Sequence, residues 1–191
     1  MRAMRRQDSA GLTLLEVLIA VSVLAILSAL TLPAMGQRAD RQRLVTVAET
    51  LAADLNEARF EASKHAGGIG LSAQAGPQWC WSLAVGQAPA AACACSPDQG
   101  CGLKQVKATS HPGIVMQTGQ AVQMTPDGSA SITTQNSTHT TIHTTPHTTT
   151  VALFESRRGE QLRVDLLAVG RSRICAPHTV QAHPLSRYPR C

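Results

Sequence analysis

The sequence predicts an α+β protein in which one long N-terminal helix packs on a mostly antiparallel β-sheet. Residues 12–32 are mostly apolar and carry no charge except for one glutamate, and residues 37–65 repeat apolar side chains at spacings of three and four. After residue 68 the chain breaks into short apolar segments separated by turn residues. The first two patterns are typical of helices and the third of strands. We therefore expect a membrane half of the helix over 12–33, an amphipathic half over 34–66 and a β-rich globular domain over 67–191.

The composition indicates an exported, membrane-anchored chain rather than a cytosolic enzyme. Only 15% of the 191 residues are charged and the formal net charge is +5, whereas an average soluble domain has roughly 25% charged residues. Apolar residues make up 43% of the chain, which excludes a disordered, highly charged tail. Six cysteines in a chain of this size indicate an oxidising compartment.

The N-terminal apolar segment is long enough to cross a bilayer. Residues 12–32 match the roughly 20 residues that a transmembrane helix needs, and the three arginines before them favour a cytoplasmic N-terminus. A cleaved secretory signal is the alternative, but Pro33-Ala34-Met35 fits its cleavage site poorly. Neither a secretory signal nor a simple anchor explains Glu16, because a carboxylate in a membrane helix is unfavourable and by default functional.

A short motif at the start of this segment carries a resemblance. Gly11-Leu12-Thr13-Leu14-Leu15-Glu16, after a basic leader and before the apolar run, resembles the class III signal of type IV pilins and type II secretion pseudopilins. The resemblance implies that a prepilin peptidase removes the leader, 1–11, by cutting after Gly11 and methylates the new N-terminus at Leu12. Gly permits the close backbone approach that such cutting requires. Leu12 departs from the family, in which Phe is usual.

The same resemblance implies a role for Glu16 in assembly. In the family this carboxylate stays in the mature chain and neutralises the N-terminal amine of a neighbouring subunit. A buried carboxylate beside a cation is far less unfavourable than an isolated one.

A second helical pattern follows the apolar segment. Pro33 is expected to break or kink the helix first. The pattern then runs over 37–65 and is expected to end at Gly67-Gly68. One face of this helix is an apolar stripe that we expect to pack as ordinary core: Leu44, Val47, Ala48, Leu51, Leu55, Ala58 and Ala62.

The globular domain is expected to be built from short strands. Pro126-Asp127-Gly128 predicts a turn, and Arg158-Gly159-Glu160 predicts a hairpin connection. The segments with strand character are residues 69–73, 78–85, 103–108, 113–124, 149–156 and 161–169.

Further motifs narrow the resemblance to one branch of the pilins. Leu55-Asn56-Glu57-Ala58-Arg59-Phe60-Glu61-Ala62 resembles the L-x-x-A-R-x-E-A run of the GspH/FimT family. Trp79 and Trp81, Phe154 with Gly159, and Gly170-Arg171-Ser172-Arg173-Ile174-Cys175 follow in the order that this family shows. Residues 86–150 match the family poorly. The resemblance implies a pilin fold in a single-pass protein of the bacterial inner membrane, with a periplasmic C-terminus, that later joins a pilus or pseudopilus filament.

The cysteines are expected to form disulfides. Six cysteines allow fifteen pairings, of which Cys175–Cys191, closing a C-terminal loop, is the simplest. Two further bridges would then form in a Cys-rich loop, 80–101, which holds Cys80, Cys93, Cys95 and Cys101. Cys93 and Cys95 are too close in sequence to pair readily with each other. Zinc binding by the thiolates is the alternative, but an exported compartment favours disulfides.

Residues 131–150 form a segment of low complexity with ten threonines and three histidines. Threonine is a poor helix former and Pro146 lies within the run, so we expect an exposed, extended or flexible loop. His139, His143 and His147 would share one face in a helix and also in a strand. Metal binding and O-glycosylation are the alternatives for this segment.

The C-terminal tail, 170–191, is basic. Residues 166–191 contain no acidic residue but four arginines, Arg171, Arg173, Arg187 and Arg190. In an extended chain, Arg171 and Arg173 would project to one side about 7 Å apart, which is close to the spacing of phosphates along a DNA strand. Arginine suits phosphate because its planar fork donates two hydrogen bonds, and Tyr188 could add a stacking surface.

The Gly-Arg-x-Arg pattern also resembles the C-terminal motif with which FimT-type minor pilins bind DNA in natural transformation. The resemblance implies that Arg171 and Arg173 contact DNA and that Arg187 and Arg190 support them. The alternative is a strand with solvated arginines, or an ion pair with Asp165 or Glu160.

Three functions follow as hypotheses. The first is a minor pilin of a type IV pilus that binds double-stranded DNA. The second is a GspH-like pseudopilin that serves protein export in a type II secretion system without binding DNA. The third is an anchored periplasmic enzyme, which we do not expect because the sequence holds no convincing nucleophile and base. Neither a cofactor nor a metal is expected, and the expected partners are the prepilin peptidase, other pilins or pseudopilins, and the inner membrane.

Overall fold

The computed structural model describes residues 13–86, 102–136, 139–144, 148–167, 169–177 and 187–191. The expected leader, 1–11, the cleavage position Gly11-Leu12, and Cys93, Cys95, Cys101 and His147 lie outside the described residues. The chain divides into two units, residues 1–39 and residues 40–191, which we call the helical unit and the globular unit.

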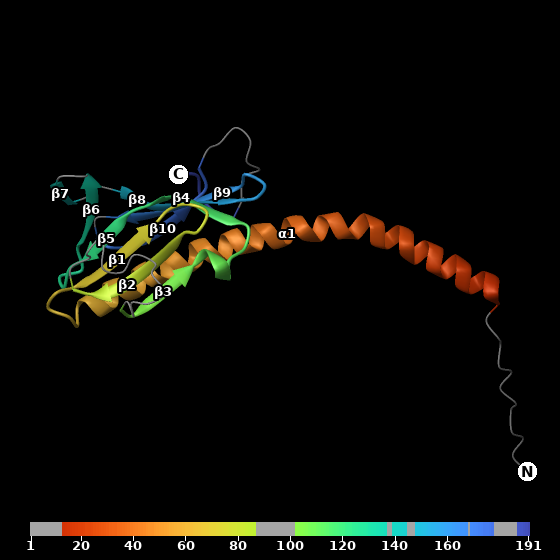
Figure 1. The fold of residues 1–191 in the computed structure, drawn as a ribbon, viewed down its shortest axis with the longest axis horizontal. Coiled ribbons are helices and arrows are strands. Elements are labelled where there is room, and N and C mark those ends of the chain that lie inside the picture. The colour runs from red at the N-terminus through yellow and green to blue at the C-terminus, as the bar shows by residue number, and fades with distance from the viewer. Residues whose placement is uncertain (1–12, 87–101, 137–138, 145–147, 168, 178–186) are drawn as a thin grey trace, which may run out of the picture. The chain divides into compact units, whose positions relative to one another are not determined.

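One helix, α1, runs from Leu14 to Ala62 and contributes to both units (Figure 1). The helix is continuous through Pro33, as expected for one long helix, so the proline does not break it. A proline inside a helix removes one backbone hydrogen bond, and the long apolar and amphipathic stretches on either side outweigh that loss. Two turns after Ala62, rather than a longer helix, lead to Gly68, whose φ of 70° suits glycine.

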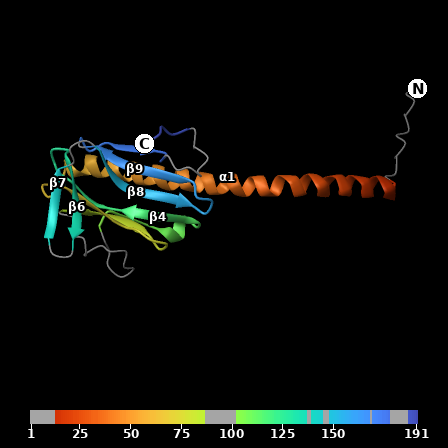
Figure 2. The same ribbon diagram turned by 90° about the horizontal axis from the view of Figure 1, so that it is seen from above.

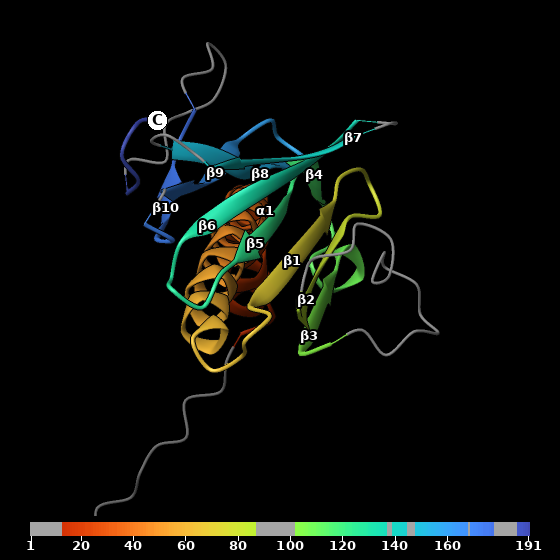
Figure 3. The same ribbon diagram turned by 90° about the vertical axis from the view of Figure 1, so that its left-hand side faces the viewer.

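The second half of α1 supplies the centre of the core. All seven residues of the expected apolar stripe are buried, and Leu44, Leu51 and Leu55 are fully inaccessible to solvent. Burying one such side chain stabilises a fold by about 1.5–3 kcal/mol. Figure 3, a view along the globular unit, shows this part of α1 flanked by β10 and β9 on one side and by β5 and β1 on the other.

Within the described residues, ten antiparallel strands form two sheets around this helix. The six-stranded sheet has the order β3-β2-β1-β5-β6-β7 and the four-stranded sheet the order β10-β9-β8-β4. Figure 2 shows β9, β8 and β4 side by side, with β6 and β7 at their left-hand end and running in a different direction. The strands are β1 (Ile69–Gln74), β2 (Cys80–Val85), β3 (Lys104–Lys107), β4 (Ile114–Gly119), β5 (Ala121–Met124), β6 (Ala130–Asn136), β7 (His139–Thr144), β8 (Thr148–Ser156), β9 (Gln161–Leu167) and β10 (Ser172–Cys175).

Two expectations about the strands are wrong. The segment 113–124 forms two strands in different sheets, β4 and β5, which part at Gln120, whose backbone N–H donates to the Val151 carbonyl. The described parts of the segment 131–150 are extended but belong to strands and not to a loop, since they form most of β6, all of β7 and the start of β8. Threonine is branched at Cβ and fits a pleated sheet well, so a composition that argues against a helix also favours strands.

An aromatic cluster joins the sheets within the core. Trp79 and Trp81 are stacked with their ring centres 5.3 Å apart, and Phe154 of β8 meets both rings edge-on at 5.7 and 6.0 Å. All three side chains are fully buried. The indole nitrogen of Trp79 donates to the Ile114 carbonyl at 2.8 Å, so the polar atom of this ring is also satisfied.

The structure contains the Cys175–Cys191 disulfide, and Cys80 is also disulfide-bonded. We expect the double variant Cys175→Ala/Cys191→Ala to be less stable by about 3 kcal/mol, because the bridge closes a loop with a sequence separation of 16 residues. Urea unfolding followed by tryptophan fluorescence measures this, since both tryptophans of the chain lie in the globular unit. Under reducing conditions the wild type and the double variant should unfold at the same urea concentration; a difference that persists would contradict the assignment to the cross-link.

Candidate functional site

The N-terminal end of α1 carries a helix cap. Thr13 precedes the first helical residue, and its Oγ1 accepts a hydrogen bond from the Glu16 backbone N–H at 3.3 Å. Thr13 and Glu16 thus have the spacing of a capping box, and the acidic side chain lies where the helix dipole favours negative charge. This feature follows from the T-x-x-E pattern but is not among the expectations above, which treat Glu16 as an assembly residue alone.

Residues 14–27 of the helical unit present a largely apolar surface. Leu14 is 84% exposed and its large apolar neighbours up to Leu27 are also exposed. Contiguous apolar surface of this extent marks a segment that another protein or a membrane covers. Among the described residues, no helix has the combined length and apolarity of a membrane-crossing segment. The crossing expected for 12–33 therefore stays a prediction.

The second candidate site is the basic edge, which we define as Arg171, Arg173, Arg187 and Arg190. β10 is the outer strand of the four-stranded sheet, and it pairs with β9 from Ser172↔Leu166 to Cys175↔Arg163. Ser172 faces α1, because its hydroxyl donates to the Ala52 carbonyl at 3.0 Å. Arg171 and Arg173, on either side of Ser172, are exposed.

One arginine of the basic edge lies beside a buried carboxylate. Asp165 of β9 is fully buried and accepts hydrogen bonds from Arg163 Nη2 at 3.0 Å and Thr150 Oγ1 at 3.1 Å. Arg173 Nη2 lies 4.0 Å from the same carboxylate. The expected alternative, an arginine paired with Asp165, is therefore realised for Arg173, whereas Arg171 forms no ion pair within the described part of the chain.

The end of the tail folds back onto α1. The hydroxyl of Tyr188 donates to Glu49 Oε1 at 2.6 Å, and Arg187 Nη2 lies 3.9 Å from the same oxygen. Burial, followed by the hydrogen bond to Glu49, raises the pKa of Tyr188 to about 12, so the phenol stays a hydrogen-bond donor at neutral pH. Tyr188 is therefore a structural anchor here, and its ring packs against the core rather than standing free to stack on a base.

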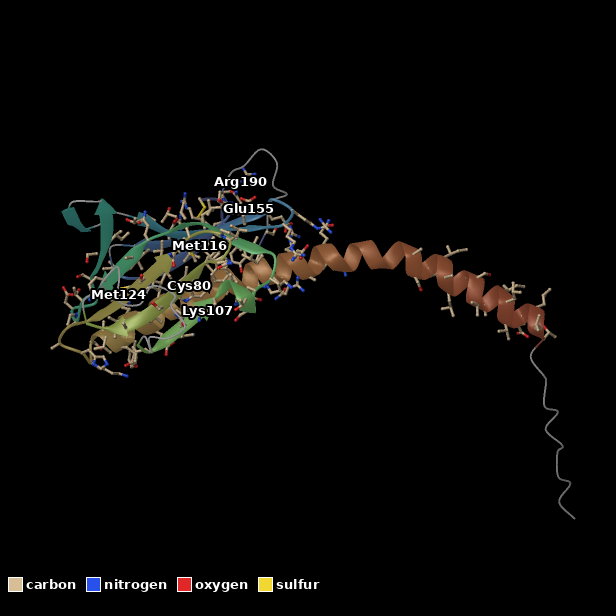
Figure 4. The ribbon with its side chains drawn as sticks, viewed as in Figure 1. Cys80, Lys107, Met116, Met124, Glu155 and Arg190 are labelled. Atoms are coloured by element: carbon tan, nitrogen blue, oxygen red, sulfur yellow. A yellow bond between two sulfur atoms is a disulfide. The ribbon has the colours of Figure 1, made fainter. Side chains whose placement is uncertain are left out.

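Arg190 is placed by the last residues of the chain. A parallel bridge pairs it with Ala176, and the Ala176 backbone N–H donates to the Pro189 carbonyl at 2.9 Å. Arg190 is exposed and is not ion-paired in the described residues. Figure 4 labels Arg190 at the upper edge of the globular unit, away from Met124 at its left-hand end.

A buried polar group fixes α1 to the six-stranded sheet. Asp54 of α1 is 1% exposed and accepts hydrogen bonds from the indole nitrogen of Trp81 at 2.8 Å and from Lys104 Nζ at 2.5 Å. The charge of Asp54 is paired and both of its oxygens are bonded, as a buried carboxylate requires. This contact could not be predicted, because nothing in the sequence links residues 54, 81 and 104.

A cavity of about 460 Å³ lies where β2 and β4 begin and β3 ends. Its lining includes Trp79, Cys80, Lys107 and Pro112. His111 stacks on Trp79 with a ring distance of 6.0 Å, and burial lowers its pKa. No group of three potential metal ligands occurs among the residues that the structure describes, a set that leaves out Cys93, Cys95, Cys101 and His147.

An apolar N-terminal helix with a capped start, continuing into an antiparallel domain that packs on its second half, defines a pilin-like filament subunit. Residues 6–32 match the model of the prokaryotic N-terminal methylation motif, and residues 47–170, well over half of the chain, match the model of the type II transport protein GspH. The chain therefore belongs to the GspH family. A search of curated proteins found no significant match, and neither did a search of solved structures.

Membership of this family implies processing by prepilin peptidase, anchoring in a membrane and assembly into a filament with other pilins or pseudopilins. The family match ends at Gly170, one residue before Arg171. It does not cover the basic edge, so binding by those arginines has to be argued from their geometry.

Proposed function

We propose that this chain is a minor pilin of a type IV pilus whose basic edge binds double-stranded DNA for natural transformation. Its helical unit would cross the bacterial inner membrane once, with the C-terminus in the periplasm, before the subunit enters the filament. The role is one of binding and assembly, without catalysis. The observation that carries the proposal lies at the start of β10, where Ser172 faces α1 and Arg171, the residue before the strand, is exposed without an ion pair among the described residues.

The membrane part of this proposal is supported by the exposed apolar surface of the helical unit. A bilayer would cover that surface before assembly, and neighbouring helices would cover it afterwards. Three arginines precede it in the sequence, which favours the proposed orientation.

The alternative is a GspH-like pseudopilin of a type II secretion system that serves protein export and does not bind DNA. The description of the matching family model favours it. A deletion strain separates the two systems, because loss of DNA uptake with normal exoprotein secretion supports the pilus, and the reverse result supports the secretion system.

DNA binding itself has a direct test with the full chain in detergent micelles and a fluorescent duplex. Because arginines that contact phosphate displace counterions, log K should fall with log [salt] in proportion to the number of contacts. We expect Arg171→Gln/Arg173→Gln to lower affinity at low salt by on the order of tenfold or more and to make the slope about 1.8 less steep.

The matched control removes two arginines elsewhere in the globular unit. Arg157 and Arg158 lie between β8 and β9, and Arg158 pairs with Asp40 at 3.6 Å. Arg157→Gln/Arg158→Gln changes the net charge equally and should leave the slope unchanged. Equal losses in both double variants would show that the charge alone, not the basic edge, attracts DNA.

A further inference from the structure

The motif residue Arg59 on α1 lies against the glycine that begins the Gly-Arg-x-Arg segment. A Cβ atom at Gly170 would lie 3.0 Å from Arg59 Cδ and 3.2 Å from its Nε. A Cβ atom at Gly128, in the turn after β5, would lie 3.5 Å from Arg59 Nε and 3.7 Å from its Nη2. The side chain of Arg59 therefore runs between two turns that carry no side chain at these positions.

Both glycines have a backbone reason of their own. Their φ values are 82° at Gly128 and 71° at Gly170, in the left-handed region that favours glycine. At Gly170 a Cβ atom would also lie only 2.6 Å from the Gly128 carbonyl oxygen. Because neither glycine has a side chain, the Arg59 side chain has room to lie against both turns.

Arg59 is a half-buried cation that has no partner among the residues the structure describes. It forms no ion pair and no hydrogen bond within the described part of the chain. Its helical neighbours at spacings of three and four carry no acid, since they are Leu55, Asn56, Ala62 and Ser63. The nearest acid along the Gly128 turn is Asp127, whose carboxylate is held by the Thr125 hydroxyl and by the backbone and side chain of Ser129.

We infer that Arg59 is a further phosphate-binding residue of the DNA site, acting from α1 beside Arg171. This inference rests on the proposed function. An arginine whose guanidinium is unpaired and partly fixed by packing loses little freedom when it binds a phosphate. Arg59 thereby extends the basic edge across Gly170 and onto the helix.

The extended site follows α1. Gly170 lies at Arg59, Ser172 bonds to Ala52, and Arg187 and Tyr188 contact Glu49. The ten helical positions from Arg59 to Glu49 span about 15 Å, a length along which one DNA strand presents several phosphates. Arg59, the segment with Arg171 and Arg173, and Arg187 therefore follow one another along α1.

The test compares two Arg59 variants with a control on the same helix, again with the full chain in micelles and duplex DNA. Arg59→Met keeps a long side chain between the glycines but removes the charge, and Arg59→Lys keeps the charge. Arg43 serves as the control, since it lies on α1 but is paired with Asp40 at 3.5 Å. We expect Arg59→Met to lower affinity about fivefold to tenfold and to reduce the salt slope by about 0.9.

The same measurement with Arg59→Lys should keep the salt slope of the wild type, and Arg43→Gln should change neither slope nor affinity by more than about twofold. If Arg59→Met retains the wild-type slope while the wild type binds DNA through Arg171 and Arg173, the inference is wrong and the proposed function stands. A loss of affinity with an unchanged slope and a lowered thermal midpoint shows a purely structural role and also overturns it. If the wild type does not bind DNA, both the proposed function and the inference fail.

Discussion

Glu16→Ala should nearly abolish incorporation of this chain into filaments while leaving prepilin processing intact. In the proposed assembly, the Glu16 carboxylate neutralises the N-terminal amine of a neighbouring subunit within an apolar surface. Glu16 stands among exposed apolar residues, with Leu15 69% and Val17 48% exposed, so the pair would be buried once helices pack there. Removing one partner of a buried ion pair costs about 3–5 kcal/mol, which corresponds to a factor of 100 or more in the equilibrium.

The structure offers a second explanation for Glu16, and two further variants separate it from the first. If its role were to cap the helix, Glu16→Gln would restore incorporation, because glutamine also serves in a capping box. If its charge is needed, Glu16→Gln should fail like Glu16→Ala. Thr13→Val removes the hydroxyl that accepts the Glu16 N–H bond but keeps the charge, so it should assemble. Immunoblots of sheared filaments and of membranes measure incorporation and processing in each strain.

The periodic features of this fold could be read from the sequence because burial acts on them locally. The spacing of Leu44, Leu51 and Leu55 places them on one helical face, and the structure buries all three. The Cys175–Cys191 disulfide could be predicted for a different reason, since the other four cysteines cluster elsewhere in the chain. The strands β6 and β7 were missed because threonine-rich, weakly apolar segments look alike in loops and in strands.

The contacts that define the candidate sites could not be read in this way. Arg59 and Gly170 are far apart in sequence, and only the packing of the last strand on α1 brings them together. The pairing of Arg173 with Asp165 depends on the register between β10 and β9. A shift of β10 by one residue would turn the Arg173 side chain to the other face of the sheet, away from Asp165. The sequence allows either an ion-paired or an unpaired arginine in the tail. In the structure Arg173 is paired with Asp165, and Arg171 has no ion pair among the described residues.

Trp81→Ala should destabilise the globular unit by about 3–5 kcal/mol, the largest loss that we expect from a single substitution in its core. The ring is fully buried between Trp79 and Phe154, and it also provides one of the two hydrogen bonds that satisfy Asp54. The variant therefore leaves a cavity and, in addition, a buried carboxylate oxygen without its donor. Since domains are stable by only about 5–15 kcal/mol, much of the chain should be degraded before assembly.

Two milder variants divide this loss into its parts. Trp81→Phe keeps most of the ring volume but not the indole N–H, so it should cost about 1–3 kcal/mol through the unsatisfied Asp54 oxygen. Asp54→Asn keeps an acceptor for the indole but weakens the bond to Lys104, whose ammonium is partly exposed and can be rehydrated. Urea unfolding followed by Trp79 fluorescence gives each free energy. If Trp81→Phe is as stable as the wild type, the hydrogen bond from Trp81 to Asp54 contributes nothing to the stability of the globular unit.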